Sequence, residues 1–238
     1  MLTQEEQERI RKSFKVKNWS ETKAEDAWSI FKIMGEFANG YEKMSAIGPC
    51  VAIFGSARTK PEDKYYVMAE EIAYELTQRG FGVITGGGPG IMEAGNKGAH
   101  RGGGKSVGLN IVLPMEQSSN PYIDKDKCID FQYFFTRKTI FTRYAQGFIV
   151  MPGGFGTLDE FFEALTLVQT QKLANFPIVL VGKSYWQGML DWIKTTMVDE
   201  GNINADELQL FKVVETVEAA VNIIEDFYTR YALRPNFC

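Results

Sequence analysis

Cysteine and histidine are scarce in this sequence, with three cysteines and one histidine among 238 residues. Cys50, Cys128 and Cys238 lie far apart and form no CxxC pair, which argues against a zinc site or a disulfide framework and favours a reducing compartment. His100 lies near the end of an expected helix, where a surface role is the simpler interpretation. We therefore expect neither histidine-dependent nucleophilic catalysis nor a metal, and the sequence implies no cofactor.

Long apolar runs and an excess of positive charge are also missing. No apolar run approaches the roughly 20 residues of a membrane span, and the start MLTQEEQERIRKSFK is charged where a signal peptide needs an apolar core. The net charge of −4 provides no general attraction to nucleic acid or to an anionic membrane surface. We expect a soluble cytoplasmic protein that binds neither nucleic acid nor membrane.

What the sequence does contain is an alternation of short Val/Ile/Phe-rich runs with amphipathic stretches, beginning near Pro49. The apolar runs are nearly continuous, as in parallel strands buried on both faces. Strands that alternate with helices predict an α/β fold, a doubly wound and mainly parallel sheet flanked by helices, of the modified Rossmann type. We expect helices over residues 65–79, 137–146, 157–172 and 185–200.

The first part of the chain has a different pattern. Apolar residues at helical spacing predict an amphipathic helix before the sheet, and these residues are Trp28, Phe31, Met34, Ala38 and Tyr41. No Pro-, Gly- or Ser-rich linker detaches it. We expect a single α/β domain over residues 48–238, with a helical extension over residues 1–47 that packs on the core or at a subunit interface.

Two glycine-rich segments resemble nucleotide-binding motifs without matching them. AHRGGGKS, residues 99–106, has Ala99 where the GxxxxGK[ST] phosphate loop needs glycine, and it runs from helix to strand instead of from strand to helix. GGGPGIM fails the GxGxxG dinucleotide fingerprint, because Ile91 stands at the third glycine. We interpret the first segment as an ordinary helix end.

Two other glycine turns fit an anion site: TGGGPGIME over residues 85–93 and MPGGFGTLDE over residues 151–160. Each turn joins a strand to a helix, so backbone N–H groups and the positive end of the helix dipole can face a ligand. One such turn would be read as a tight connection, but two at strand ends of one sheet favour phosphate binding. Thr157 is expected to cap its helix. The candidate phosphate contacts are Gly87, Gly88, Gly90, Gly153, Gly154, Gly156 and Thr157.

Charged residues follow these turns. Glu93 and Glu160 are expected at equivalent positions in the two helices, with Glu163 on the same face as Glu160. A carboxylate behind a phosphate loop is repelled by phosphate, so we expect it to act on the sugar or the leaving group. Arg137 and Lys138 at a helix start oppose the helix dipole, which favours a functional role over a solvated face.

These motifs together resemble a known family. GGGPGIMEAGNKGA, the pair RK at 137–138 and PGGFGTLDE are similar to the LOG family, cytokinin riboside 5′-monophosphate phosphoribohydrolases, whose members have often been labelled lysine decarboxylases. The signature PGGxGTxxE is matched in full, and the resemblance covers roughly residues 50–182. The long N-terminal region resembles the longer bacterial branch, which implies a homo-oligomer, a dimer or a larger assembly up to a hexamer.

The resemblance implies that a purine nucleoside 5′-monophosphate, a cytokinin riboside monophosphate or AMP, is hydrolysed at its N-glycosidic bond to free base and ribose 5-phosphate. It implies Arg137 and Glu160 as the catalytic pair. Asp159 is Glu in many relatives. The remaining implied substrate contacts are Ser56, Glu93, Lys138, the 153–159 turn and Thr166.

The chemistry of these residue types agrees with the resemblance. Glycosidic cleavage develops oxocarbenium character on ribose, which Glu160 can stabilise while it orients water. Arg137 can hold the phosphate or offset charge on the departing base, and the sequence leaves both roles open. Candidates to line an apolar base pocket are Met92, Met115, Phe134 and Phe155.

Three alternatives share some of these residues. Lysine decarboxylation needs a lysine bound to pyridoxal phosphate, and no lysine here has a recognisable cofactor context. A carrier that holds a nucleotide or nucleotide-bearing cofactor, as in molybdenum-cofactor carriers with related sheets, would not need Arg137 and Glu160 together. A transferase that passes ribose to another acceptor would use the same residues.

Overall fold

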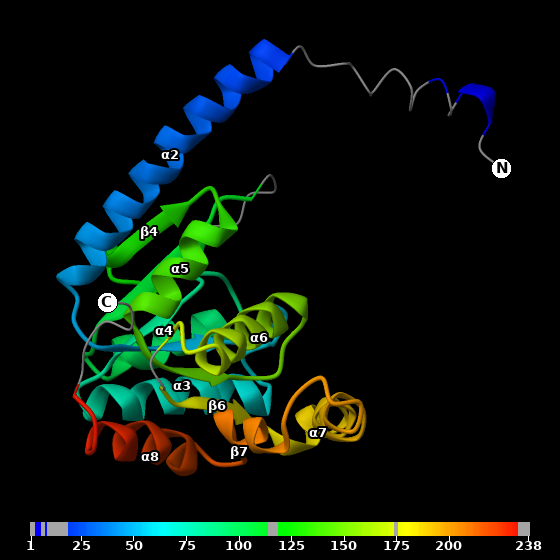
Figure 1. The fold of residues 1–238 in the computed structure, drawn as a ribbon. Helices are drawn as coiled ribbons and strands as arrows, with labels where there is room; N and C mark the ends of the chain where they lie inside the picture. Colours follow the sequence, from blue (N-terminus) through cyan, green and yellow to red (C-terminus); the bar gives the residue numbers. More distant parts are fainter. Residues whose placement is uncertain (1–2, 6–7, 9–18, 114–118, 174–175, 233–238) are drawn as a thin grey trace.

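The computed structural model describes residues 3–5, 8, 19–113, 119–173 and 176–232, and the structural statements below concern these residues. A sheet lies between two layers of helices, and one long helix extends away from it (Figure 1). The strands are β1 (Cys50–Phe54), β2 (Gly82–Thr85), β3 (Ser106–Ile111), β4 (Cys128–Phe131), β5 (Ala145–Val150), β6 (Ile178–Val181) and β7 (Lys212–Val214). The helices are α2 (Trp19–Ser45), α3 (Lys64–Gln78), α4 (Ile91–Arg101), α5 (Phe134–Tyr144), α6 (Phe155–Gln169), α7 (Lys183–Trp192) and α8 (Val217–Tyr228).

The sheet has the strand order β4-β3-β2-β1-β5-β6-β7, and every neighbouring pair is parallel. The chain starts at the centre, builds outward to β4, then returns to place β5 on the free side of β1. The doubly wound parallel sheet is therefore confirmed. In such sheets ligands bind at the carboxyl ends of the strands where the direction of winding reverses, which here lies between β1 and β5.

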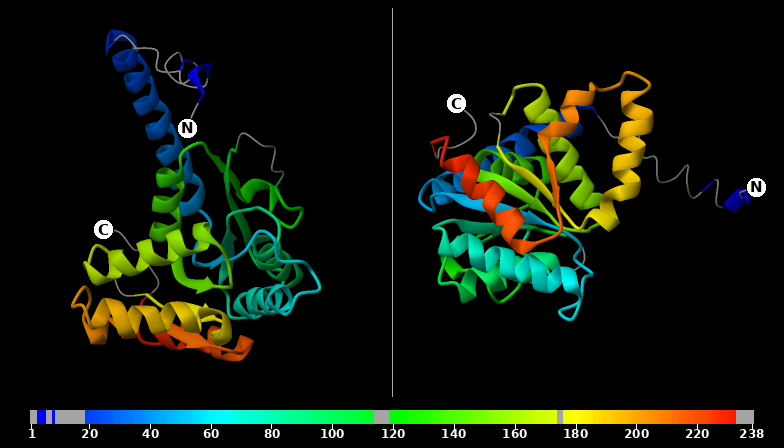
Figure 2. Two further views of the ribbon diagram at one scale, coloured as in Figure 1. Left: turned by 90° about the vertical axis from the view of Figure 1, so that its right-hand side faces the viewer. Right: turned by 90° about the horizontal axis from the view of Figure 1, so that it is seen from below.

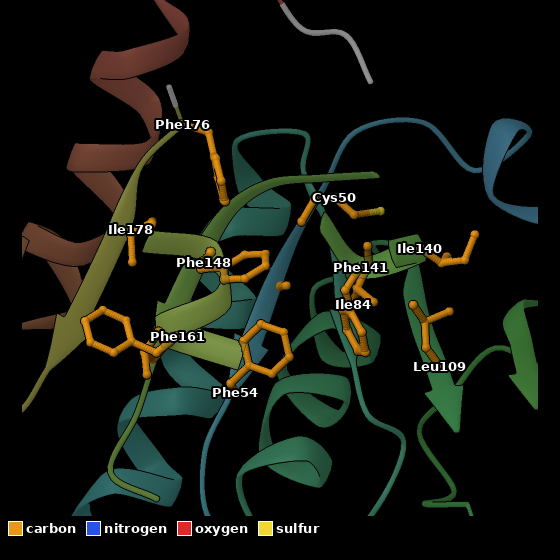
Figure 3. Close-up of a cluster of buried hydrophobic side chains, with 14 of the residues drawn as sticks. Cys50, Phe54, Ile84, Leu109, Ile140, Phe141, Phe148, Phe161, Phe176 and Ile178 are labelled. Carbon is orange, nitrogen blue, oxygen red and sulfur yellow. The ribbon is translucent and has the colours of Figure 1, made fainter. Parts of the chain in front are cut away.

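The central strands are buried on both faces, as their continuous apolar runs predict. Every residue of β1, β2, β5 and β6 is buried. On one face Phe54 packs against Phe141 of α5 and Phe148 of β5, with ring centroids 5.0 and 4.9 Å apart (Figure 3). On the other face Ile53 packs among residues of α3, α4 and α8. Two hydrophobic cores, one on each face of the sheet, therefore support the strand-to-helix turns at its carboxyl edge.

The four helices predicted over explicit ranges all begin earlier than predicted, α3 at Lys64, α5 at Phe134, α6 at Phe155 and α7 at Lys183. The predicted start of α6 at Thr157 is wrong, because the helix begins at Phe155 with Gly154 as its N-cap residue and no side-chain cap. Thr157 lies within the first turn and is buried. α5 begins at Phe134 and ends at Tyr144, since the buried strand β5 already starts at Ala145.

The carboxylates Glu93 and Glu160 are consequently not equivalent. Glu93 is in the first turn of α4, whereas Glu160 is the sixth residue of α6 and lies in its second turn. α7 also ends before the predicted residue 200, at Trp192, and continues as a π-helical turn over Ile193–Val198. The segment AHRGGGKS runs from the end of α4 to the start of β3, so its interpretation as a helix end is confirmed.

Helix α2 lies within the predicted N-terminal extension, and its C-terminal half packs on α5. Glu36 accepts hydrogen bonds from the Gln132 backbone N–H at 2.6 Å and from the Thr136 hydroxyl at 2.5 Å. Figures 1 and 2 show the other half extending past the domain. Three of the predicted stripe residues of α2 stay largely exposed, namely Trp28, Phe31 and Met34. None of the described helices combines the length and apolar character that crossing a membrane requires.

Candidate functional site

A cavity of about 850 Å³ opens at the carboxyl ends of β1, β2 and β5. Three strand-to-helix turns form it, around residues 55–59, 86–88 and 152–157. Its volume is within the range of about 300–1,000 Å³ typical of small-molecule sites. The sheet therefore brings both predicted glycine turns to one cavity. Predicted contacts that line it are Ser56, Gly87, Gly88, Gly153, Gly154, Gly156 and Thr157.

Backbone hydrogen bonds connect the three turns. The Ser56 N–H donates to the Pro152 carbonyl, and the Ile91 N–H donates to the Ser56 carbonyl, both at 3.0 Å. Gly90 has φ +68°, and a Cβ there would overlap the backbone of Ser56 and Ala57. Gly90 is therefore required for close approach of two turns. It does not line the cavity itself.

Gly87 is also required by its surroundings. It has φ +75°, and a Cβ would overlap the side-chain oxygen of Asn110. The Gly87 N–H donates to the Thr85 hydroxyl at 3.0 Å, so this turn is held by its own strand. The result is a backbone turn that passes close to the cavity without a side chain in between.

The start of α6 offers unpaired backbone donors. The Gly154 carbonyl accepts from the N–H groups of Thr157 and Leu158, at 3.0 and 3.1 Å. In the part of the chain that the structure describes, no acceptor is recorded for the N–H groups of Gly154, Phe155 and Gly156. Consecutive open N–H groups at the positive end of a helix dipole favour an anion such as phosphate.

Arg137 and Glu160 face each other across the same cavity. The Arg137 Nη2 lies 4.0 Å from the Glu160 Oε1, and the two side chains are only 13% and 6% exposed. Burial raises the pKa of Glu160 from its usual 4.5 to about 7, although Lys138 and Arg137 act in the opposite direction. Burial likewise lowers the pKa of Arg137, against the attraction of Glu160.

Both side chains retain buried polar atoms that lack a partner. Among the described residues, no group hydrogen-bonds the Arg137 Nε or the Glu160 Oε2. The Arg137 guanidinium lies over the rings of Phe134 and Phe141, 5.3 and 5.9 Å from their centroids. Buried polar atoms without partners are costly, so this arrangement is suited to a ligand that completes their hydrogen bonds.

Lys138 and Thr166 lie outside this cavity. Lys138 pairs with Asp159 at 2.9 Å and with Glu163. These four residues line a second, shallow depression on the outer side of α6. Glu163 therefore does not accompany Glu160 into the main cavity.

Glu93 also lies outside the lining of the main cavity. Its Oε1 accepts a hydrogen bond from the Tyr66 hydroxyl at 3.0 Å. Burial, followed by this bond, raises the pKa of Tyr66. Glu93 thereby joins α3 to α4.

The apolar part of the lining matches the expected base pocket. Met92, Phe134 and Phe155 all line the cavity, and Met115 lies outside the described residues. Among the residues described, no group of three or more His, Cys, Asp or Glu side chains could hold a metal ion.

The sequence interpretation missed several residues at the cavity. Arg58 could have been predicted from the sequence, because it follows Ser56 by two residues and is the one cation of the turn at residues 55–59. Tyr65, Asn110 and Tyr185 lack such a signal, because they reach the cavity from elements that carry no motif.

Comparison with known proteins identifies relatives that cover most of this chain. Cytokinin riboside 5′-monophosphate phosphoribohydrolase LOG4 of Arabidopsis thaliana is 26% identical over 196 residues, covering 81% of this chain and 88% of that protein. The enzyme LOG of Oryza sativa subsp. japonica is 28% identical over 181 residues, covering 74% and 72%.

Solved structures show the same fold. The molybdenum cofactor carrier protein of Chlamydomonas reinhardtii matches with a TM-score of 0.56 and 22% identity, covering 76% of this chain and 99% of that chain. TM1055, a structural-genomics target, matches with a TM-score of 0.54 and 27% identity, covering 75% and 99%.

A family model described as "Possible lysine decarboxylase" matches residues 92–224, more than half of the chain. The matched region contains Arg137, Glu160 and the complete PGGxGTxxE signature. The protein therefore belongs to this family, the LOG family that its motifs resemble.

Proposed function

We propose that this protein hydrolyses the N-glycosidic bond of a purine nucleoside 5′-monophosphate and releases the free base and ribose 5-phosphate. The observation that carries the proposal is the buried Arg137–Glu160 pair beside the open N–H groups of α6, in one cavity. Two relatives named as phosphoribohydrolases add support. The phosphate lies at the glycine turns, which leaves the ribose near Glu160.

Glu160 is the group that acts on the ribose. Its ionised carboxylate stabilises the positive charge that develops at the anomeric carbon and orients the attacking water. Its pKa of about 7 means that a substantial fraction is ionised at neutral pH. Arg137 provides the positive charge that balances the phosphate or the departing base.

The substrate base is adenine or an adenine with an apolar substituent. The cavity has apolar side chains at the end of β3 and on α5, including Ile111, Leu113 and Phe134. These residues can contact a flat purine and also an apolar tail, because removing apolar surface from water is favourable whichever ligand provides it. AMP and cytokinin riboside monophosphates are both proposed as substrates.

The protein is also proposed to form homo-oligomers. Trp28, Phe31 and Met34 on α2 are 68%, 63% and 60% exposed. Large apolar side chains clustered on one exposed helix are typical of interaction surfaces. A second copy of this chain fits the apolar character of the surface, and the oligomeric state in solution tests this.

Decarboxylation of lysine does not fit the residues of the cavity. The lining includes the cations Arg58 and Arg137, and none of the lining residues that the structure describes is a lysine. Pyridoxal phosphate needs a lysine for its Schiff base, so this site cannot hold the cofactor in its reactive form.

A nucleotide carrier is the second candidate, because its phosphate contacts would be the same. A carrier does not need a buried carboxylate with a raised pKa beside an arginine. Incubation of the protein with AMP separates the two functions. Hydrolysis produces adenine and ribose 5-phosphate in equal amounts, whereas a carrier returns intact AMP, and adenosine with free phosphate would contradict both.

A further inference from the structure

Each glycine turn of the cavity has a carbonyl that is held by a side chain from another element. The Tyr185 hydroxyl on α7 donates to the Gly153 carbonyl at 2.7 Å. The Asn120 side-chain N–H donates to the carbonyls of Gly87 and Gly88, at 3.1 Å each. The Asn120 backbone N–H adds a bond to the Gly87 carbonyl at 2.9 Å.

A hydrogen bond to the carbonyl of one residue also fixes the direction of the N–H group of the next residue. The C=O and N–H of a trans peptide unit point in opposite directions in one plane, and none of the described peptide bonds is cis. The bond to the Gly153 carbonyl therefore directs the Gly154 N–H away from the Tyr185 hydroxyl. The bonds to the Gly87 carbonyl direct the Gly88 N–H away from Asn120 in the same manner.

These two N–H groups remain available to a ligand. Gly88 and Gly154 both line the cavity. Within the described ranges, neither N–H has a recorded acceptor. Gly88 is buried, and buried backbone donors are nearly always paired in a complete structure, so a ligand acceptor is expected at its N–H group. Gly154 is exposed at the start of α6, where its N–H group is open to a ligand.

We propose that Tyr185 and Asn120 are positioning residues, which hold the N–H groups of Gly154 and Gly88 toward the phosphate of the substrate. Neither side chain needs to touch the substrate in this role. The proposal rests on the proposed function for the identity of the ligand, but it concerns the binding of the phosphate and not the cleavage of the glycosidic bond.

Asn120 is itself held by a buried polar network. The Asn96 Oδ1 accepts from Asn120 at 2.9 Å and from the Thr85 hydroxyl at 2.5 Å. The Asn96 side-chain N–H groups donate to the Ser106 hydroxyl at 2.9 Å and to the Val107 carbonyl at 3.1 Å. Because the Asn96 amide must donate on one side and accept on the other, it fixes the orientation of Asn120.

Tyr185 is supported in a different way. Its ring packs edge-to-face on Trp186, with centroids 4.8 Å apart. The Trp186 indole N–H donates to the Val181 carbonyl at 3.0 Å, so the pair is fixed to the end of β6. Tyr185 is half exposed, and its hydroxyl can be removed without leaving a cavity in the core.

The decisive experiment compares two tyrosine variants. Tyr185→Phe removes the bond to Gly153, and Tyr228→Phe removes an equivalent bond of 2.6 Å to the Gln146 carbonyl, away from the cavity. Isothermal titration calorimetry with ribose 5-phosphate measures the dissociation constant of each variant. Tyr185→Phe is expected to raise it by about 3- to 10-fold, the usual range for one hydrogen bond, and Tyr228→Phe by less than about 2-fold.

Steady-state kinetics and a second variant complete the test. Tyr185→Phe is expected to raise KM for AMP and to leave kcat within about 2-fold, since it alters phosphate binding alone. Asn120→Asp replaces the donors with a carboxylate that repels two carbonyl oxygens, and we expect its dissociation constant to rise by more than about 10-fold.

The possible outcomes separate this proposal from the proposed function. An unchanged dissociation constant in Tyr185→Phe, or equal changes in both tyrosine variants, would overturn the positioning role even if the protein hydrolyses AMP. The expected change in a protein that releases no base would support the positioning role and contradict hydrolysis. A wild-type protein that does not bind ribose 5-phosphate would overturn both.

Discussion

Arg137 on α5 and Glu160 on α6 are separated by 4.0 Å between Nη2 and Oε1, too far for a hydrogen bond. The two groups attract each other while the Arg137 Nε and the Glu160 Oε2 stay without partners among the described residues. A pair that closed fully would satisfy itself and offer little to a substrate. The open pair instead leaves donors of Arg137 and an acceptor of Glu160 for the ligand.

Glu160→Gln is expected to lower kcat for AMP by at least about 100-fold, because the amide cannot stabilise the oxocarbenium charge or act on water. For the wild type, kcat/KM should fall as the pH drops below about 7, where Glu160 takes up a proton. Initial rates of base release across pH measure both effects. Glu207→Gln, in the 3-10 helix Ala205–Leu210 outside the cavity lining, is the control, and rates near wild type in Glu160→Gln would remove Glu160 from the mechanism.

The same substitution is expected to stabilise the fold at high pH. Burial raises the Glu160 pKa from 4.5 to about 7, so the native state binds more protons than the unfolded state between these values. Stability is therefore lost as the pH rises through this window. Urea unfolding should show Glu160→Gln more stable than wild type by on the order of 1–3 kcal/mol at pH 8, and nearly equal at pH 4.5. If Glu160→Gln is less stable than the wild type at pH 8, burial of the ionised Glu160 carboxylate does not destabilise the fold, which would contradict this prediction.

Arg137→Lys is expected to lower kcat/KM by roughly 10- to 100-fold, although the charge is kept. A lysine lacks the planar fork that lies over Phe134 and Phe141 and that offers several donors at once. Arg79→Lys, at an ion pair with Glu75 and Glu225 far from the cavity, is the matched control. Equal, small effects of both variants on steady-state rates would mean that Arg137 acts only as a charge.

Gly87→Ala tests the close approach in the β2–α4 turn. The alanine would meet the Asn110 side-chain oxygen at φ +75°, and we expect a loss of about 2–4 kcal/mol in the free energy of unfolding. Gly103→Ala has a similar φ of +68° with open space around it, so it should lose only about 1 kcal/mol. Chemical denaturation of both variants measures the difference, and equal losses would show that Asn110 moves aside freely.

The strands and their parallel arrangement were predictable because the strands of a parallel sheet are buried on both faces. Each strand is therefore a nearly continuous apolar run in the sequence. Runs such as CVAIF and GFIVM carry that information locally. The start of α6 was missed because Phe155 and Gly156 read as turn residues, whereas the helix begins at Phe155 without a side-chain cap and leaves its first N–H groups open. Tertiary context thus overrode the low helix propensity of glycine.

The candidate site was predictable only where a motif marks it. Glu160 and the glycine turns belong to contiguous signatures, and the sheet brings them together. Tyr185 and Asn120 carry no local pattern, because their role depends on contacts with residues more than 30 positions away. Lys138 follows Arg137 in sequence, but successive helix residues point in different directions, and Lys138 faces the outer side of α6.

The measurement that tests the central claim most directly is base release from matched pairs of substrates. The purified protein is incubated with AMP, with isopentenyladenosine monophosphate and with the two unphosphorylated ribosides, and chromatography detects the free base. We predict base from both monophosphates and none from either riboside, because the glycine turns bind the phosphate that places the ribose at Glu160. Equal release from ribosides and monophosphates, or no release from any of the four, would contradict this account.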